Sequence, residues 1–289
     1  MPTNGFFEKS IFLSNWFSIL LVTCVAVLLR YLLAKVDVAK YLWGHHHEGM
    51  ADDLANNSKE GHCEEYFSAL PEVEHVPYIG ATITLPGGSR QFYEMANNRR
   101  SVRAFKPHPI PAFEVIENCI LAAGCAPSGA HTEPWTFCVI SNKDLKHRIR
   151  CIVEREEEIN YAQRMSKQWR NDLRPLKTNH VKSYLTDAPY LILVLKQVYG
   201  FTKSGKRKQH YYNEISVSIA VGILLCALQA AGLSSLVTTP LNCGAALCRL
   251  LKRPINEKLL VLMPIGYPSD NCLIPNFKRK ELKDIVFVK

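Results

Sequence analysis

The sequence predicts an α+β domain in which helices cover a mixed β-sheet, preceded by one N-terminal transmembrane helix. Short apolar runs alternate with segments of helical periodicity, which is typical of a sheet covered by helices. Hydrophobic residues make up 47% of the 289 residues, enough for one large buried core. The N-terminal region also contains a long uncharged apolar stretch, which sets it apart from the rest of the chain.

This stretch runs from Ile11 to Leu29 and reads IFLSNWFSILLVTCVAVLL. An α-helix needs ~20 such residues to cross a bilayer, so residues 1–35 are predicted to be a membrane anchor. A cleaved signal peptide is the alternative, but no site of small residues follows the run before Arg30. Basic residues after the span favour a single-pass membrane protein whose C-terminal domain is cytoplasmic.

The polar residues 36–75 are predicted to be a linker, and residues 76–289 the main folded domain. The linker holds three consecutive histidines, but no second ligand cluster at suitable spacing, so no metal site is expected. The ten cysteines form no C-x-x-C pair, which argues against a zinc site. Lys and Arg number 35 against 26 Asp and Glu, but they are scattered, and no nucleic-acid partner is expected.

Short apolar runs mark the expected strands. They are rich in branched and aromatic residues, which suits strands buried on both faces. The runs are residues 135–140, 190–195 and 259–263. Helical periodicity marks residues 91–98 and 112–123, and the second helix has Pro111 at its first turn and Gly124 at its end.

A longer helix is expected from His210 to Gly232. It is apolar nearly all round after Glu214, as a helix at the centre of a fold or at a subunit interface must be. Its polar start argues against a second membrane span. We therefore expect a buried core helix that also contributes to a dimer interface.

The segment NNRRSVRAF, Asn97 to Phe105, gathers three arginines and a hydroxyl at the end of an expected helix. Guanidinium groups suit a phosphate dianion, although a charged surface turn is the alternative interpretation. Three further segments offer a tight turn, a pair of threonine hydroxyls and another guanidinium: APSGAHTEPW, SLVTTPLNCG and PNFKRK.

The motifs RRSVR, APSGAHTEPW, NEISVSIA and TTPLNCG, in this order, resemble the nitroreductase superfamily of flavin enzymes. Within it, the chain is most similar to the branch that deiodinates iodotyrosine. The resemblance covers residues 72–289 and also suits an N-terminal anchor. It implies a nitroreductase-like homodimer with an FMN at each interface, in which residues 284–289 add a strand to the partner's sheet.

The resemblance also implies which residues hold FMN. Arginine and serine side chains would contact the phosphate or the ribityl chain, and Thr239 would be catalytic through a hydrogen bond to flavin N5. Val237 stands where some relatives have threonine, so it can offer only backbone contacts. The implied cofactor-binding residues are Arg100, Ser101, Val102, Arg103, Ser128, Gly129, Val237, Thr238, Thr239 and Arg279.

The acidic segment EREEEINYAQRM, residues 154–165, is by default a solvated helix face. The resemblance instead makes Glu157, Tyr161 and Lys182 a clamp for an amino acid zwitterion. Glu157 suits the ammonium group, Lys182 the carboxylate, and Tyr161 can donate a hydrogen bond to that carboxylate. The backbone amide of Ala130 would receive the substrate phenolate, under a lid that orders when substrate arrives.

The implied reaction is the reductive removal of iodide from mono- and diiodotyrosine. Electrons would come ultimately from NADPH, and because no G-x-G-x-x-G turn occurs, a separate reductase is expected to deliver them. One alternative is a broad-specificity FMN nitro or quinone reductase, which has no need of the zwitterion clamp. The other is a flavin- or halotyrosine-binding protein without turnover.

Overall fold

The fold comes from a computed structural model that describes residues 30, 73–78, 80, 85–202 and 204–289. Contacts divide the chain into two units, residues 1–65 and 66–289, and the second holds the domain described below. The expected anchor, apart from Arg30, and nearly all of the expected linker lie outside the described residues, so the domain limits stay predictions.

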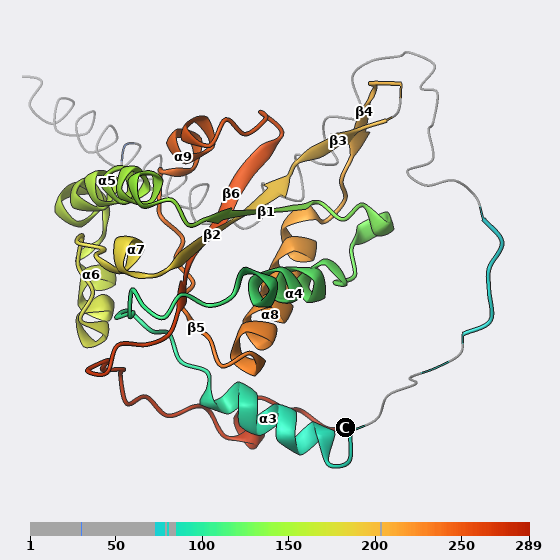
Figure 1. The fold of residues 1–289 in the computed structure, drawn as a ribbon, viewed down its shortest axis with the longest axis horizontal. Coiled ribbons are helices and arrows are strands. Elements are labelled where there is room, and N and C mark those ends of the chain that lie inside the picture. The colour runs from blue at the N-terminus through green and yellow to red at the C-terminus, as the bar shows by residue number, and fades with distance from the viewer. Residues whose placement is uncertain (1–29, 31–72, 79, 81–84, 203) are drawn as a thin grey trace, which may run out of the picture. The chain divides into compact units, whose positions relative to one another are not determined.

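A four-stranded sheet forms the centre of the domain (Figure 1). Its strands, in spatial order, are β1 Trp135–Ile140, β2 Tyr190–Gln197, β6 Glu257–Gly266 and β5 Ser234–Ser235. All three ladders are antiparallel. Parallel pairing is limited, in the described part of the chain, to one bridge between Ser101 and Ser235. The expectation of a mixed sheet is therefore corrected to an antiparallel sheet, because apolar runs buried on both faces suit either direction.

Helices and short turns surround this sheet. The α-helices are α3 Gly88–Asn98, α4 Phe113–Gly124, α5 Lys143–Ile159, α6 Lys167–Leu173, α7 Tyr184–Asp187, α8 Asn213–Ala230 and α9 Gly244–Leu250. The shorter turns are η1 Gly129–His131, the π-helical η2 Asn160–Arg164, η3 Arg174–Leu176 and η4 Leu282–Asp284. A separate hairpin pairs β3 Tyr199–Phe201 with β4 Arg207–Gln209.

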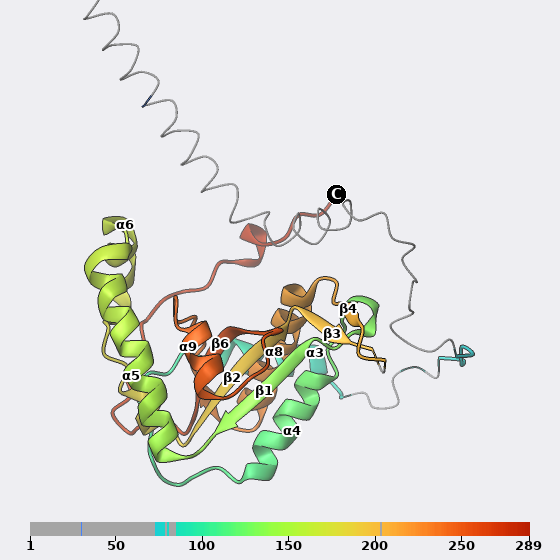
Figure 2. The same ribbon diagram turned by 90° about the horizontal axis from the view of Figure 1, so that it is seen from above.

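The core has two layers because successive residues of β2 point to opposite faces of the sheet. Leu191 and Leu193 pack in a cluster with residues of α5, α7 and α9. Ile192 and Val194 pack in the other cluster, with residues of α4 and α8. Figure 2 shows the two helical layers from above. The prediction that this strand is buried on both faces is confirmed.

Most predicted boundaries agree with the observed elements to within a few residues. β1 spans the predicted range, and α4 begins and ends one residue later than expected. α3 begins earlier, at Gly88. α8 begins at Asn213 because Tyr212 takes a left-handed conformation, with φ of 51°, which ends the preceding turn.

Among the described residues, α8 is the one helix long and apolar enough to cross a membrane. It lies against α4 and the sheet, with Val217, Leu224 and Leu228 fully buried, as predicted for a core helix. Its other face leaves Ile215 and Ile219 exposed, at 56% and 41%. Among the described residues nothing covers these two apolar side chains, which share the exposed face with Glu214 and Ser218.

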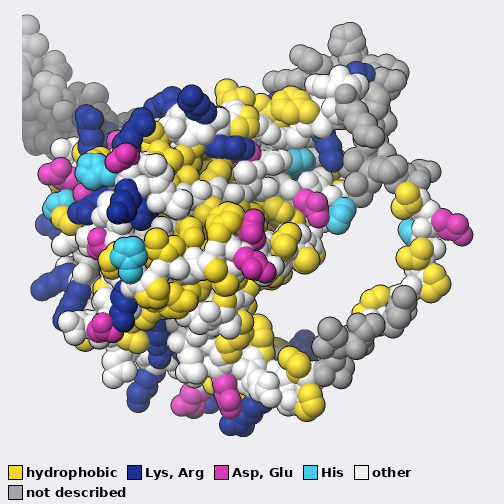
Figure 3. All heavy atoms as spheres, viewed as in Figure 1, with side chains coloured by type: hydrophobic (Ala, Val, Ile, Leu, Met, Phe, Trp, Pro, Cys, Tyr) yellow, Lys and Arg dark blue, Asp and Glu magenta, His cyan; other side chains and the backbone are white. Residues whose placement is uncertain are grey.

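Exposed apolar side chains also gather elsewhere. Figure 3 shows them over α4, and the basic side chains on the same face are dispersed, not concentrated in one patch. The C-terminal segment after β6 exposes a further set: Leu273, Ile274, Phe277, Leu282, Ile285, Val286, Phe287 and Val288.

Candidate active site

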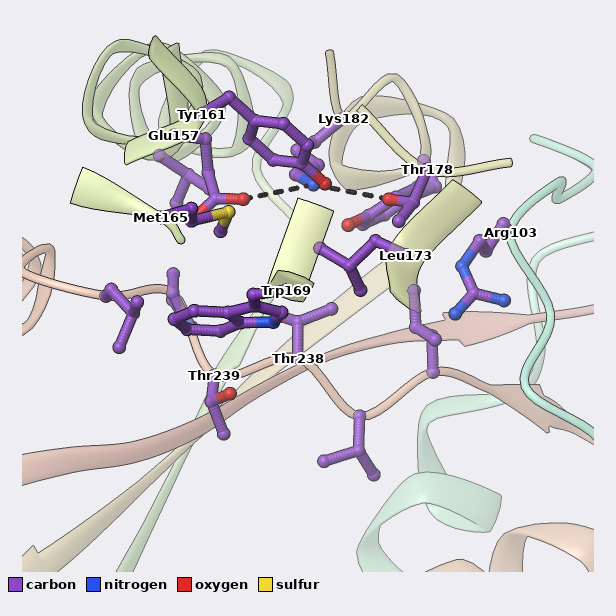
Figure 4. A pocket seen from close by; sticks show the side chains of 16 residues that line it. Arg103, Glu157, Tyr161, Met165, Trp169, Leu173, Thr178, Lys182, Thr238 and Thr239 are labelled. Atoms are coloured by element: carbon purple, nitrogen blue, oxygen red, sulfur yellow. Dashed lines mark hydrogen bonds and ion pairs between the residues drawn. The ribbon is translucent and has the colours of Figure 1, made fainter. Parts of the chain in front are cut away.

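A cavity of about 240 Å³ lies between the end of α5 and the loop after β5. Figure 4 shows Glu157, Tyr161 and Lys182 on one side of this cavity and Thr238 and Thr239 on the other. Its lining residues are Arg103, Val153, Glu157, Tyr161, Met165, Trp169, Leu173, Thr178, Lys182, Tyr184, Leu236, Val237, Thr238, Thr239, Pro240 and Leu241. Seven of the residues singled out in the sequence are among them.

The turn from α5 into η2 brings the acidic side of the cavity together. The helix widens to a π-turn at Asn160, whose carbonyl accepts a hydrogen bond from the Met165 amide at 2.8 Å. Such turns are often found at functional sites. Glu157 and Tyr161, four residues apart, both line the cavity, and the Glu157 side chain is buried rather than solvated. The default interpretation of a solvated acidic face is therefore wrong for Glu157.

Lys182 and Glu157 form an ion pair inside the cavity. The Nζ of Lys182 lies 3.2 Å from Oε2 of Glu157, and also donates to the carbonyl of Asn179 at 2.5 Å. It lies 3.5 Å from Oγ1 of Thr178 and 5.6 Å from the centre of the Tyr161 ring. Buried charges persist only when they are paired and hydrogen-bonded, and these two meet that condition through each other.

Two phenols border the pair. Burial raises the pKa of Tyr161 above its ordinary value, with a smaller opposing contribution from its hydrogen bond with Thr178. Burial also raises the pKa of Tyr184 well above its ordinary value. Both phenols are therefore neutral hydrogen-bond donors at physiological pH, and Tyr161 can donate to an anionic group in the cavity.

The loop after β5 forms the opposite side. Thr238 is tied to β6, because its amide and its hydroxyl both donate to the carbonyl of Leu262, at 3.0 and 2.8 Å. The neighbouring Thr239 is exposed and its hydroxyl makes no hydrogen bond with the described residues. Val237 is exposed beside it. Thr239 thus offers a free donor on a loop that the sheet holds in place.

A group of guanidiniums lies beside this loop. The amide of Val102 donates to the Ser235 carbonyl at 3.2 Å, which ties the arginine-rich segment to β5. Arg279 donates to the carbonyl of Arg99 at 3.2 Å. Burial, followed by the nearby charges of Arg279 and Arg100, lowers the pKa of Arg99.

None of these guanidiniums, nor that of Arg103, pairs with a carboxylate among the described residues. Neighbouring positive charges without a counter-charge favour a bound anion.

The turn η1 lies elsewhere. The amide of Gly129 donates to the Ser216 hydroxyl at 3.3 Å, and a Cβ at Gly129 would lie 2.8 Å from the Tyr211 carbonyl oxygen. Ser128 accepts a hydrogen bond from the Glu133 amide at 3.0 Å. Figures 1 and 2 both place this turn at the end of β1 opposite α5 and α6. Within one chain, Ser128, Gly129 and Ala130 therefore do not join the cavity.

Sequence reasoning missed the apolar part of the cavity. Trp169 and Leu173 line it from α6, and their spacing of four residues places them on one face of that helix; Met165 joins them from the extended residues before the helix begins. Ser166 caps this helix by accepting a hydrogen bond from the Trp169 amide at 3.1 Å. Ser166 and this spacing could be recognised in the sequence, but only the fold shows that these apolar residues line the same cavity as Thr239.

Comparison with known protein families shows to which family the chain belongs. The model of the Nitroreductase family matches residues 96–267, which contain both sides of the cavity and η1. The chain belongs to the nitroreductase family. The resemblance inferred from the motifs is thereby confirmed.

Individual relatives agree. The chain is 61% identical over 224 residues to an iodotyrosine deiodinase of Drosophila melanogaster, covering 77% of this chain and 78% of that one. It is 52% identical over 242 residues to iodotyrosine deiodinase 1 of Homo sapiens, covering 83% of each chain. A crystal structure of oxidized iodotyrosine deiodinase bound to FMN and 3-iodo-L-tyrosine superimposes with a TM-score of 0.60. It is 32% identical and covers 68% of this chain and 97% of that one.

Proposed function

We propose that this chain is an FMN-dependent deiodinase that removes iodide reductively from mono- and diiodotyrosine. The observation that carries the proposal is the buried pair of Glu157 and Lys182, with Tyr161 beside it, in the same cavity as Arg103 and Thr239. A carboxylate and an ammonium held together in a cavity suit a zwitterion. The relatives named iodotyrosine deiodinase, at 52% and 61% identity, point to the same substrate class.

The residues present fit FMN. Its phosphate is a dianion, and the guanidiniums of Arg100, Arg103 and Arg279 have no carboxylate partner among the described residues. The free hydroxyl of Thr239 suits a hydrogen bond to a ring nitrogen of the flavin. The flavin would have further contacts with Ser101, Val102, Val237 and Thr238. Its ring would be bordered by Ser128 and Gly129. When bound and reduced, FMN would supply two electrons that, with one proton, replace the carbon–iodine bond with a carbon–hydrogen bond and release iodide, leaving oxidised FMN.

The substrate would exchange partners with the internal ion pair. Its ammonium group takes the place of the Lys182 ammonium beside Glu157, and its carboxylate takes the place of the Glu157 carboxylate beside Lys182. The neutral phenol of Tyr161 then donates to the same carboxylate. Each buried charge keeps an opposite charge throughout, which avoids the large cost of a lone buried ion. The amide of Ala130 would receive the phenolate oxygen.

The apolar segment over the cavity has a separate task. Trp169 and Leu173 line the cavity together with the charged trio, so they can exclude water from the aromatic ring of the substrate. Exclusion of water strengthens the ion pairs on which binding depends. It also means that the proton that takes the place of iodine on the ring comes from a bound group and not from bulk water.

A homodimer would unite the two groups of FMN residues. η1 and the cavity lie apart in one chain, and a second copy can place its η1 beside the cavity of the first. The exposed apolar face of α8 and the exposed apolar residues of the C-terminal segment offer surfaces for such a partner. Residues 284–289 would add a strand to the partner's sheet.

Two further parts of the proposal concern the source of electrons and the location of the protein in the cell. A separate reductase would deliver electrons from NADPH, since the sequence has no dinucleotide-binding turn. The N-terminal helix would hold the protein in a membrane with the catalytic domain cytoplasmic.

The test uses the purified full-length protein in detergent, loaded with FMN and reduced with dithionite. Iodide release is measured from 3-iodotyrosine, from diiodotyrosine and from 2-iodophenol, which lacks the zwitterion. We expect rapid release from the two amino acids and slow release from the phenol. Equal turnover of all three, or efficient reduction of nitroaromatics, would favour the broad reductase. Tight binding of 3-iodotyrosine without iodide release would favour a binding protein.

A further inference from the structure

Asn160 is fully buried behind the acidic side of the cavity, at 0% exposure. Its Nδ2 lies 3.3 Å from Oε1 of Glu157. Its Oδ1 lies 3.1 Å from a guanidinium nitrogen of Arg164 and 3.4 Å from Nδ2 of Asn242. Asn242 follows Thr239 in the same loop. One amide therefore connects the carboxylate of the charged pair to the loop on the other side of the cavity.

The neighbours of Asn160 fix the orientation of its amide. The guanidinium of Arg164 can only donate hydrogen bonds, so the amide oxygen must face it. The ionised carboxylate of Glu157 can only accept them, so the amide nitrogen must face that carboxylate. Both requirements agree on one orientation. An aspartate here would satisfy Arg164 but would bring a second carboxylate to Glu157.

Glu157 thus has one donor for each carboxylate oxygen. Lys182 approaches Oε2 and Asn160 approaches Oε1. When a substrate carboxylate draws Lys182 away, the amide of Asn160 is, in the described part of the chain, the hydrogen-bond donor that stays on Glu157. At 3.3 and 3.4 Å, the contacts of Asn160 with Glu157 and Asn242 are longer than the usual range of about 2.7–3.2 Å. Contacts of this kind often shorten when a substrate binds.

We propose that Asn160 is a positioning residue for recognition of the substrate ammonium group. It holds the Glu157 carboxylate where the ammonium is received, and it ties that position to the loop that carries Thr239. The inference rests on the proposed function, because it presumes an amino acid substrate. It adds a residue that does not line the cavity and acts on substrate recognition through Glu157.

A purely structural role makes a different prediction. If Asn160 only braced the fold, its loss would weaken FMN binding, substrate binding and thermal stability together. If it positions Glu157, its loss weakens binding of amino acid ligands selectively. Ligands without an ammonium group are unaffected, since they do not use Glu157.

The experiment compares full-length, FMN-loaded wild-type protein with Asn160→Asp and Asn160→Ala. The aspartate variant preserves shape and the acceptor toward Arg164 but removes the donor toward Glu157. Asn171→Ala is the matched control, because Asn171 is exposed on the neighbouring α6 and makes no hydrogen bond through its side chain with the described residues. Flavin fluorescence is titrated with 3-iodotyrosine and with 2-iodophenol, and FMN affinity and melting temperature are measured alongside.

We expect Asn160→Asp to raise the Kd for 3-iodotyrosine at least about tenfold, equivalent to ~1.4 kcal/mol. The Kd values for FMN and 2-iodophenol should change less than about twofold, a change of under ~0.5 kcal/mol. Asn242→Gly suits the left-handed backbone of this residue, φ 62°, and removes only its side chain. It should give a smaller loss, and combining it with Asn160→Ala should add nothing, because both act through one hydrogen-bonded chain.

Unchanged or tighter binding of 3-iodotyrosine by Asn160→Asp overturns the inference. Parallel losses of FMN affinity and melting temperature also overturn it, in favour of the structural role. If Asn160→Ala fails to fold, the near-isosteric aspartate variant still decides. Wild-type protein that binds FMN but not 3-iodotyrosine would refute the proposed function, and this inference with it. Normal wild-type binding with an unaffected aspartate variant refutes the role of Asn160 alone.

Discussion

Lys182 and Glu157 are paired at 3.2 Å in the cavity, with 8% and 10% of their side chains exposed. Each charge is compensated by the other in the absence of a substrate. A zwitterionic ligand must therefore replace this internal pair, and its binding energy is the difference between two sets of ion pairs. That exchange links the stability of the domain to its choice of ligand.

The first prediction concerns stability. Glu157→Gln and Lys182→Gln should each destabilise the FMN-loaded protein by up to ~3–5 kcal/mol, because each leaves one buried charge unpaired. The double variant should be more stable than either single variant, since it leaves none. Urea unfolding measures all three. Arg90→Gln, in an exposed pair with Glu94, is the control and should cost under ~1 kcal/mol. Additive losses in the double variant would show that the charges are not coupled.

The second prediction concerns ligand choice. The same two single variants should weaken 3-iodotyrosine binding by ~2–5 kcal/mol, because one end of the zwitterion is left unpaired. Tyr161→Phe should cost ~0.5–1.5 kcal/mol, the usual net value of one hydrogen bond. Titration of flavin fluorescence measures each affinity, and FMN affinity should stay near the wild-type value. If all variants bind 3-iodotyrosine as well as wild type, the clamp is wrongly assigned.

The third prediction concerns the cofactor. Arg100→Ala, Arg103→Ala and Arg279→Ala should each weaken FMN binding by ~1.5–3 kcal/mol through loss of a charge-assisted contact. Equilibrium dialysis against free FMN gives the affinities, with Arg90→Ala as the control for a surface arginine. Riboflavin, which lacks the phosphate, should bind weakly and respond little to these substitutions. An equal response to both flavins would place the arginines away from the phosphate.

The sequence was most informative where structure depends on local pattern. α4 and β1 were predicted closely because an apolar period and a terminating Gly124 are local signals. The direction of the strands was not predicted correctly. A long helical connection such as the one from β1 to β2 usually joins parallel strands, yet this pair is antiparallel.

The candidate site likewise has residues that the sequence predicted and residues that only the fold reveals. The spacing of Glu157 and Tyr161 could be seen in the sequence, whereas Lys182 was reached only through family resemblance. The π-turn at Asn160 and the approach of Trp169 to the cavity depend on tertiary packing. No periodicity in the chain encodes them.

The fourth prediction concerns pH. His210 is 3% exposed beneath Gly200, and burial lowers its pKa below the ordinary 6.5, despite a hydrogen bond with the Gln197 carbonyl. The unfolded chain therefore takes up a proton first as pH falls. The stability that neutral His210 contributes is present above about pH 6.5 and is lost as pH falls through its lower folded value. Urea unfolding of wild type and His210→Gln between about pH 8 and pH 5 measures the difference. A constant difference between the two proteins would contradict the argument.

The last prediction concerns the shared site. η1 and the cavity lie apart in one chain, so a single chain cannot bring Gly129 to a flavin bound, as proposed, beside Arg103 and Thr239. Gly129→Val should inactivate by disturbing η1, because its Cβ would lie 2.8 Å from the Tyr211 carbonyl oxygen. Lys182→Gln should inactivate through the cavity. In a two-fold dimer with shared sites, one variant of each kind rebuilds one intact site from its two unaltered halves.

Mixing the two inactive variants under conditions that allow subunit exchange should therefore restore about one quarter of wild-type iodide release, since half of the dimers are mixed and each holds one intact site. Ile215→Asp, on the exposed face of α8, should prevent both dimerisation and recovery because a charge would be buried in the interface. Sedimentation velocity checks the oligomeric state of every sample. Recovered iodide release would show that each active site is formed by residues of two chains. Stable mixed dimers without recovered activity would instead place each site within one chain, and η1 would then have no part in holding the flavin.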